Sequence, residues 1–382
     1  MKIAILIKRF IRTGGAERYA VELSKSLLKR GHEVHVYCQE LDDAACKGVI
    51  VHTIKRFVKK PTHLNSWHFA LETARLIKKE RYDIVHSFER VLKCDVFYVS
   101  CICYRNWLWR DQSRTKKIIN YMKAAINPRH LSYLILEALQ FQRGRHKKIV
   151  ATSQLIKNDI LANYNRRPQE VEVIYPGVDG EIFQPDLLRV YRNRIRDAYK
   201  ILEQEIVLLF VGSEFKRKGL QYLIEGISLL HQQLKGQKKV RCFVVGGGDS
   251  TEYRMQAQAF GVEDLVIFVG LSSEVEKYCA ASDIFVLPSR KEPSSMAVLE
   301  AMACELPVII VKESGIAEFV RDGYDALLLA DPTSGEEMKE KILYLMDPDQ
   351  RRVIGTNARK NILEHSWKQV CDQMLKVYGR VE

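Results

Sequence analysis

The sequence predicts an α/β protein made of two doubly wound, parallel-sheet domains. Short apolar runs typical of buried strands alternate with segments of helical periodicity, and this alternation pauses near residue 175 and restarts near residue 206. The chain has 382 residues, a length that favours two domains over one. We therefore expect an N-terminal domain over 1–175, a C-terminal domain over 176–365, and a final helix within 366–382 that packs back on the first domain.

The N-terminal half begins with a strand at 2–7, and the Gly14-Gly15 turn leads from it into a helix with an apolar face. Gly31 is placed to end that helix, and Ser153 to cap a later one over 154–163. The other expected elements are strands at 33–38, 83–86, 95–100, 148–152 and 171–174 and a helix at 67–80. Strands that alternate with helices in this way indicate parallel pairing through right-handed crossovers.

The C-terminal half repeats the pattern. Strands are expected at 206–211, 241–245, 266–269, 284–289, 307–311 and 326–329, and helices at 219–234, 272–282 and from 294–295 onward. A polar, charged helix is expected within 184–204, near the domain junction. In such folds ligands bind outside the carboxyl ends of the parallel strands, so the segments that follow the strands are the candidate sites.

Composition points to a reducing compartment and an anionic partner. The net charge is +13, and the nine cysteines are scattered through apolar segments, which is typical of reduced thiols. No run approaches the roughly 20 apolar residues of a membrane-spanning helix, and the apolar start at 2–7 is too short for a signal peptide. Cys101-x-Cys103 lacks a second ligand pair at zinc spacing, so we predict no metal site. We expect a cytoplasmic protein.

The most informative segment holds two glutamates around a turn. Glu292 precedes the Ser294-Ser295 turn, which follows a predicted strand, and Glu300 lies in the helix that the turn opens. The first N–H groups of a helix are unpaired and lie at its positive end, so they attract anions. The carboxylates can accept hydrogen bonds from hydroxyl groups. A sugar nucleotide, a diphosphate joined to polyols, suits both features, although a solvated helix glutamate explains Glu300 alone equally well.

Two further segments follow predicted strands. Lys216-Arg217-Lys218 comes after the strand that ends at Gly212, where a cluster of cations can bind phosphate. Solvated surface lysines are the plainer alternative. Gly14-Gly15 follows the first strand and lets the backbone approach a ligand, but an ordinary tight turn explains the pair as well. It is not the G-x-G-x-x-G pattern of dinucleotide-binding proteins.

Together these motifs resemble the retaining glycosyltransferases of family 4, which have the GT-B fold of two Rossmann-like domains facing across a cleft. The resemblance extends over nearly the whole chain. It rests on Gly14-Gly15-Ala16-Glu17-Arg18, Arg217-Lys218-Gly219, the glutamate pair followed by Glu-Ala-Met-Ala, and the final Ser366-Trp367 helix. It implies an enzyme that transfers a hexose from a nucleotide sugar to a phosphorylated glycolipid acceptor and that needs no further cofactor.

The resemblance also implies roles for single residues. Arg217 and Lys218 match the cations that neutralise the donor diphosphate, Glu292 matches the glutamate that binds the donor sugar hydroxyls, and Glu300 matches the one that holds the ribose. Of these, Arg217, Lys218 and Glu292 are the expected catalytic residues. Because two cations can take the place of a metal ion at the diphosphate, we expect metal-independent transfer.

The remaining donor-binding residues follow from the same resemblance. The backbone of Ser295, Met296 and Ala297 matches the helix start that receives the phosphates. Gly14 and Gly15 match the N-terminal loop near the diphosphate and the acceptor.

Within the family, the chain is most similar to enzymes that move glucose from UDP-glucose to a heptose of the lipopolysaccharide core. This likeness rests on Val211–Gly219, Asp95–Tyr98 and Cys103-Tyr104. Two positions depart from it: Ser294-Ser295 replaces the usual Phe-Gly, and Cys101 aligns with an aspartate. These departures leave open a hexosyltransferase for a lipid-linked oligosaccharide or an exopolysaccharide, and a GT-B binding protein without turnover.

A basic segment carries most of the excess charge. Residues 105–148 hold eleven lysines and arginines and two acids, a net +9. Aromatic anchors interleaved with cations suit the headgroup region of an anionic membrane, as would a phosphorylated glycolipid acceptor. An ordinary solvated helix is the alternative, and nucleic acid is not expected because no recognition motif accompanies the charge. We therefore expect peripheral association with the inner face of the cytoplasmic membrane, through Trp107, Trp109, Arg110, Lys116, Lys117 and Lys123.

Overall fold

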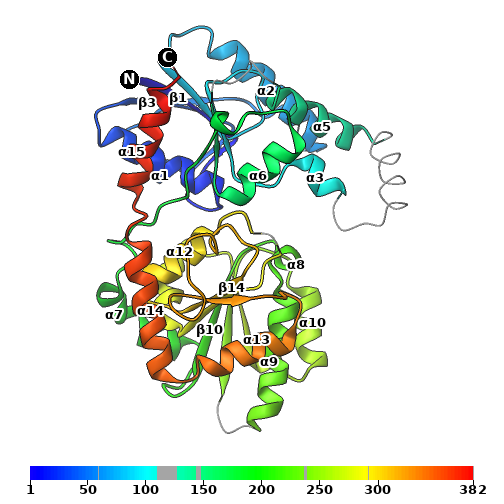
Figure 1. The fold of residues 1–382 in the computed structure, drawn as a ribbon, viewed down its shortest axis with the longest axis vertical. Helices are drawn as coiled ribbons and strands as arrows, with labels where there is room; N and C mark the ends of the chain where they lie inside the picture. The colour runs from blue at the N-terminus through cyan, green and yellow to red at the C-terminus, as the bar shows by residue number, and fades with distance from the viewer. Residues whose placement is uncertain (59, 110–126, 143–147, 236–238, 291, 382) are drawn as a thin grey trace. The chain divides into compact units, whose positions relative to one another are not determined.

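The computed structural model describes residues 1–58, 60–109, 127–142, 148–235, 239–290 and 292–381. The chain divides into two compact units (Figure 1). The N-terminal unit contains residues 1–176 and 367–382, and the C-terminal unit contains residues 177–366. Among the described helices, none is both long enough and apolar enough to cross a membrane.

The N-terminal unit is built on a seven-stranded sheet in the order β5-β3-β1-β6-β7-β8-β9, with every pairing parallel. Its strands are β1 (Lys2–Leu6), β3 (Glu33–Cys38), β5 (Ile50–Thr53), β6 (Ile84–Ser87), β7 (Val96–Val99), β8 (Lys148–Ala151) and β9 (Val171–Val173). Its helices include α1 (Ala16–Leu28), α2 (Thr62–Leu76), α3 (Tyr104–Trp109), α5 (Pro128–Gln140) and α6 (Gln154–Asn163). Strand order reverses between β1 and β6, so the carboxyl ends of these two strands form the switch point of the sheet.

The last helix, α15 (Trp367–Tyr378), belongs to the N-terminal unit and lies beside α1 (Figure 1). Trp367 meets the fully buried Tyr19 edge-on, with ring centroids 5.1 Å apart. The Tyr378 hydroxyl lies 2.7 Å from Nδ1 of His86 on β6. Burial lowers the pKa of His86 to about 3, so this imidazole is neutral and forms part of the core.

The C-terminal unit has a six-stranded parallel sheet in the order β12-β11-β10-β13-β14-β15. Its strands are β10 (Ile206–Val211), β11 (Val240–Val245), β12 (Val266–Gly270), β13 (Ile284–Leu287), β14 (Val308–Val311) and β15 (Leu327–Leu329). Its helices are α7 (Pro185–Ala198), α8 (Phe215–Lys218), α9 (Leu220–Leu234), α10 (Thr251–Ala259), α11 (Val275–Ala281), α12 (Met296–Ala303), α13 (Gly335–Tyr344) and α14 (Pro348–Ile362). Helices on both faces bury the central strands, which explains their unbroken apolar sequences.

Several helix boundaries differ from those expected. The helix expected at 67–80 is α2, which begins at Thr62 and ends at Leu76, and the helix expected at 272–282 is the shorter α11. The polar helix expected within 184–204 is α7, which has Pro185 as its first residue, where the missing N–H of proline costs nothing.

Candidate functional site

The switch point of the C-terminal sheet lies between β10 and β13, its two central neighbours. The segment 212–219 follows β10 and contains the short helix α8, while the segment 288–295 follows β13 and leads into α12. Because the two strands are parallel and adjacent, their carboxyl ends bring these segments to the same edge of the sheet. The sequence-predicted motifs of the C-terminal half therefore meet here.

Gly219 allows the two segments to touch. It has φ +79°, in the left-handed region, between α8 and α9. A β-carbon at this position would lie 2.2 Å from the carbonyl oxygen of Pro288, so no side chain fits. The glycine after Arg217-Lys218 is thus required both by the turn and by the close approach to the end of β13.

Three polar side chains converge on one carboxylate oxygen, Oε2 of Glu292. Nη1 of Arg217 lies 3.1 Å from it and Nζ of Lys218 lies 3.3 Å from it. The Ser289 hydroxyl donates a hydrogen bond of 3.0 Å to the same atom. Glu292 is only 6% exposed. We call Arg217, Lys218, Ser289 and Glu292 the cation–glutamate cluster.

The electrostatics of this cluster favour the ionised forms of Glu292 and Arg217. Burial by itself would raise the pKa of Glu292, but Lys218, Arg217 and the Ser289 hydroxyl hold it below its ordinary value. For Arg217, burial by itself would lower the pKa, but the negative charges of Glu292 and Glu214 outweigh burial and raise the pKa above its ordinary value. The cluster therefore contains two cations and one buried carboxylate, and Glu214, which pairs with Arg217 at 2.7 Å, is largely exposed.

The start of α12 lies directly beside the cluster in the chain. Ser295 is the N-cap residue, but its side chain makes no capping hydrogen bond, so it does not satisfy the first amides at Met296 and Ala297. The hydroxyl oxygen of Ser294 is buried and has no hydrogen-bond partner among the described residues. A helix start of this kind, next to two cations, suits an anionic ligand.

Glu300 lies farther along α12 and is 3% exposed. A hydrogen bond with Cys304 and burial raise the pKa of the Cys279 thiol, and the charge of the nearby Glu300 adds to this effect. Glu300 is therefore a buried carboxylate, not a solvated surface residue, which removes the plainer interpretation of this position.

The Gly14-Gly15 turn belongs to the N-terminal unit, after β1. Gly14 has φ +92°, and Gly15 is the N-cap residue of α1. The Glu17 carboxylate folds over Gly14, where a β-carbon would lie 2.5 Å from its Oε2. Burial raises the pKa of Glu17. Glu17 therefore covers Gly14, whereas a β-carbon at Gly15 would meet no atom within 4 Å.

The six residues of the predicted membrane surface are only partly described. Trp107 and Trp109 lie in α3, and the Trp107 side chain is 57% exposed and stacks on Tyr104 with ring centroids 5.4 Å apart. Arg110, Lys116, Lys117 and Lys123 lie outside the described residues.

A buried carboxylate anchors the beginning of α3. Glu137 of α5 is 1% exposed and accepts hydrogen bonds from the backbone N–H groups of Tyr104 and Arg105, at 2.6 and 3.0 Å. It also accepts one from Arg90 at 2.9 Å and one from the Tyr164 hydroxyl at 2.6 Å. Helix α3 is therefore fixed to the core of its unit. Cys101 lies exposed in the turn between β7 and α3.

Some polar residues of these edges are not identified from the sequence. Ser289 donates to Glu292, and Glu214 pairs with Arg217. In the N-terminal unit Lys8 pairs with Glu89 at 2.8 Å and donates to Ser66 at 3.1 Å. Only their position in the sequence could have pointed to them, because Lys8 and Ser289 each come just after a buried strand. Side-chain direction decides which of such residues meet, and sequence spacing does not give it.

Family models match both halves of the chain. Residues 13–181 match "Glycosyltransferase Family 4", and residues 191–361 match "Glycosyl transferases group 1". The lipopolysaccharide glucosyltransferase WaaG of Escherichia coli K12 is 25% identical over 361 residues, which are 94% of this chain and 93% of WaaG. MJ1178 of Methanocaldococcus jannaschii, an uncharacterised glycosyltransferase, is 30% identical over 383 residues, 96% of this chain and 94% of that protein.

Two solved structures match the fold of this chain over nearly its whole length. The crystal structure of WaaG has a TM-score of 0.86 at 22% identity and covers 98% of this chain and 99% of that one. The structure of Anabaena Alr3699/HepE with UDP and glucose has a TM-score of 0.77 at 18% identity and covers 99% of both chains. The fold class and the family predicted from the sequence are confirmed, and this chain belongs to the family 4 glycosyltransferases with the GT-B fold.

Proposed function

We propose that this chain is a retaining hexosyltransferase that moves glucose from UDP-glucose to a heptose of the lipopolysaccharide core. Two likenesses support this proposal: WaaG is a lipopolysaccharide glucosyltransferase, and the similarly folded HepE binds UDP and glucose. The observation that carries the proposal is the meeting of Arg217 and Lys218 with a buried glutamate at the start of α12.

The chemistry follows from where charge develops. When the bond between sugar and diphosphate breaks, negative charge grows on the UDP leaving group and positive charge on the anomeric carbon. Arg217, Lys218 and the first amides of α12, from Ser295 to Ala297, would stabilise the negative charge. Glu292 holds both cations in place before the donor binds, so little reorganisation is needed.

The two glutamates receive different tasks. The described side-chain contacts of Glu292 all use Oε2, so we assign Oε1 to the hydroxyl groups of the donor sugar. We assign Glu300, which is buried on α12, to the ribose hydroxyls. Both carboxylates are acceptors only, which matches hydroxyl donors.

The donor assignment is tested with the purified chain and a panel of UDP-, GDP- and ADP-glucose together with UDP-galactose. We expect UDP-glucose to raise the unfolding temperature most, because a ligand present at 100 times its Kd stabilises the folded state by about 2.7 kcal/mol. UDP release should increase when a heptose-terminated lipopolysaccharide core is added. A chain that neither binds nor turns over any of these donors would contradict the proposal and favour a binding protein.

Transfer is also expected to need no metal ion. An excess of EDTA should leave the rate of UDP release unchanged. A rate that EDTA abolishes and magnesium restores would contradict metal independence.

We also propose that the acceptor is reached at an anionic membrane surface. Trp107 on α3 is 57% exposed, and Leu131 and Ile135, one turn apart on the neighbouring α5, are 43% and 42% exposed. Exposed apolar residues within the segment 105–148, which has a net charge of +9, suit an interface where apolar side chains enter the headgroup region and cations pair with anionic lipid. The glycolipid acceptor would share that surface.

The membrane proposal predicts that Trp107→Ala binds anionic vesicles about ten-fold more weakly, the factor that corresponds to about 1.4 kcal/mol and to partial burial of a large aromatic side chain. Co-sedimentation with phosphatidylglycerol vesicles at low salt measures it. Tyr324→Ala, which removes a 48% exposed aromatic side chain from the C-terminal unit, serves as the control. Equal binding by all three proteins, or no binding by any, would contradict the proposal.

A further inference from the structure

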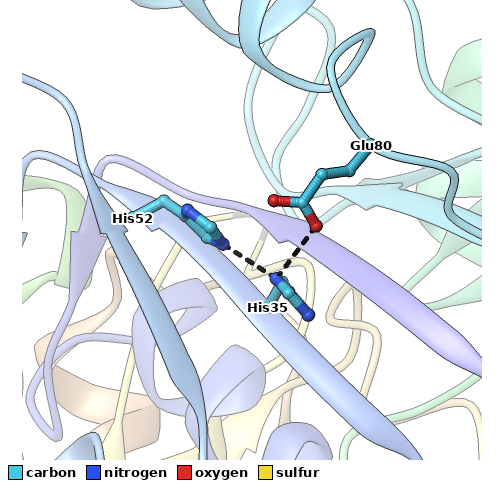
Figure 2. A group of neighbouring side chains, drawn as sticks. All are labelled: His35, His52 and Glu80. Atoms are coloured by element: carbon cyan, nitrogen blue, oxygen red, sulfur yellow. Dashed lines mark hydrogen bonds and ion pairs between the residues drawn. The ribbon is translucent and has the colours of Figure 1, made fainter.

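Three ligand-type side chains converge in the N-terminal unit, away from the strand ends discussed above. They are His35 on β3, His52 on β5 and Glu80 in the connection between α2 and β6. One nitrogen of each histidine and one carboxylate oxygen all lie within 4.8 Å of one another. Figure 2 shows the three side chains pointing toward a common point from three separate segments.

The sheet register places the two histidines on one face. Strands β3 and β5 are parallel neighbours, with His35 opposite Ile50 and Tyr37 opposite His52. Alternate residues of a strand point to the same side, so His35 and His52 share a face and lie diagonally across the two strands. Tyr37 stacks on the His52 ring at 4.4 Å between centroids and 9° between planes, which fixes the orientation of that imidazole.

A carboxylate sets the tautomer of His35. Its Nε2 lies 2.6 Å from Oε1 of Glu33, so Nε2 carries the proton and donates it. Nδ1 then presents its lone pair, 2.8 Å from Nε2 of His52 and 4.0 Å from Oε2 of Glu80. In many metal sites a histidine binds the ion through one ring nitrogen and donates the N–H of the other to a carboxylate.

We propose that His35, His52 and Glu80 form a binding site for zinc. Two imidazoles and one carboxylate are a donor set that zinc accepts, with a fourth position open to water. The Tyr82 hydroxyl lies 3.2 Å from Nδ1 of His35 and 3.3 Å from Oε2 of Glu80, where it can hydrogen-bond such a water. No metal site is predicted from the sequence, because His35 and His52 are 17 residues apart and Glu80 lies beyond the next helix.

One cation already competes for the site. Nζ of Lys2 lies 2.8 Å from Oε2 of Glu80 and 3.6 Å from Oε1 of Glu33. Zinc must displace this ammonium group from the carboxylate, so removing the positive charge should strengthen zinc binding. If the three side chains form only a hydrogen-bond network and no ion site, removing the charge of Lys2 should have no effect on zinc binding.

The position of the site suggests what an ion would do there. Lys2 and Glu33 begin β1 and β3, and Glu80 lies in the connection that leads into β6, whereas the Gly14-Gly15 turn follows the carboxyl end of β1. An ion would join the edge strand β5 to β3 and to the α2–β6 connection. We therefore expect zinc to change the stability of this unit and to leave sugar transfer unaffected, which separates a failure here from a failure of the proposed enzymatic function.

The test is a zinc titration of the chelator-treated full chain by calorimetry, with the unfolding temperature followed in parallel. We expect one zinc ion per chain and a higher unfolding temperature, with both effects lost in His52→Ala. Glu33→Gln should weaken zinc binding by roughly 10- to 100-fold, as loss of an outer-shell partner does. Lys2→Met should tighten it, and His231→Ala, on α9 of the other unit, should leave it unchanged.

Cobalt substitution checks the ligands. A cobalt complex of the chain should absorb as a site of nitrogen and oxygen ligands, without the charge-transfer band of a thiolate. Absence of zinc binding, binding that survives in His52→Ala, or a thiolate band would overturn the proposal. If His52→Ala does not fold, the opposite shifts expected for Glu33→Gln and Lys2→Met decide the question, and two unchanged affinities would refute it.

Discussion

Replacing Lys218 with alanine is expected to lower the rate of sugar transfer about 10²- to 10³-fold, the loss seen when one electrostatic donor to a developing negative charge is removed. Nζ of Lys218 lies 3.3 Å from the buried Glu292, and the side chain is only 13% exposed. Arg217 remains in the variant and keeps Glu292 paired, so the protein should still fold. UDP release from UDP-glucose measures the effect.

Lys216 provides a matched control for this experiment. It has the same charge and lies on the same short helix α8, but its side chain is exposed. Lys216→Ala should retain the rate within a few-fold, because exposed charges are screened by solvent. If the two alanine variants lose activity equally, the diphosphate is held by the general positive charge of α8 and not by Lys218. If neither loses activity, Lys218 has no part in transfer.

Replacing Glu292 with glutamine is expected to separate turnover from nucleotide binding. The variant loses the carboxylate assigned to the sugar hydroxyls, so turnover should fall about 10²-fold. UDP should bind at least as tightly as before, because Arg217 and Lys218 no longer share their charge with Glu292. Kinetics for kcat and calorimetry for UDP affinity measure the two effects separately.

The control is Glu214→Gln, which removes the other carboxylate paired with Arg217. The Glu214 side chain is 68% exposed and its oxygen lies 2.7 Å from Nε of Arg217. This variant should change turnover only a few-fold, since exposed ion pairs contribute little. A Glu292→Gln enzyme with unchanged kcat would contradict the sugar-binding role, and equal losses in the two variants would assign the effect to Arg217.

The stability that Glu292 contributes to the folded protein should depend on pH. The pKa of Glu292 lies below its ordinary value in the folded protein. A carboxylate of this kind contributes stability above its unfolded pKa of about 4.3, and the contribution disappears as pH falls through the lower folded value. The difference in unfolding free energy between the wild type and Glu292→Gln should therefore be largest near neutral pH and shrink in acid.

Buried parallel strands are the part of the fold that the sequence predicts best. Ile206–Val211 is an unbroken apolar run, and β10 has these same bounds because helices cover both faces of the sheet. The edge strand β5 is not predicted, since Ile50–Thr53 is short, half-exposed and contains a histidine. No element is predicted over residues 335–362, where the largely polar helices α13 and α14 form, because their narrow apolar faces give a weak periodic signal.

The sequence predicts the three charged members of the cation–glutamate cluster but not Ser289. Arg217, Lys218 and Glu292 all follow strands, and parallel strands bring their carboxyl ends to one edge. Which groups then pair depends on side-chain direction, so Ser289 as a third partner of Glu292 emerges only from the structure. The His35–His52–Glu80 group was out of reach for the same reason, because its members come from three segments with no shared motif.

The return of α15 to the N-terminal unit has a consequence for synthesis of the chain. Domains generally fold as they leave the ribosome, the N-terminal one first. Here Tyr19 and His86 are covered by Trp367 and Tyr378, which are made after the whole C-terminal unit. Part of the core of the N-terminal unit therefore stays unfilled during synthesis until the C-terminal unit and helix α15 have also been translated.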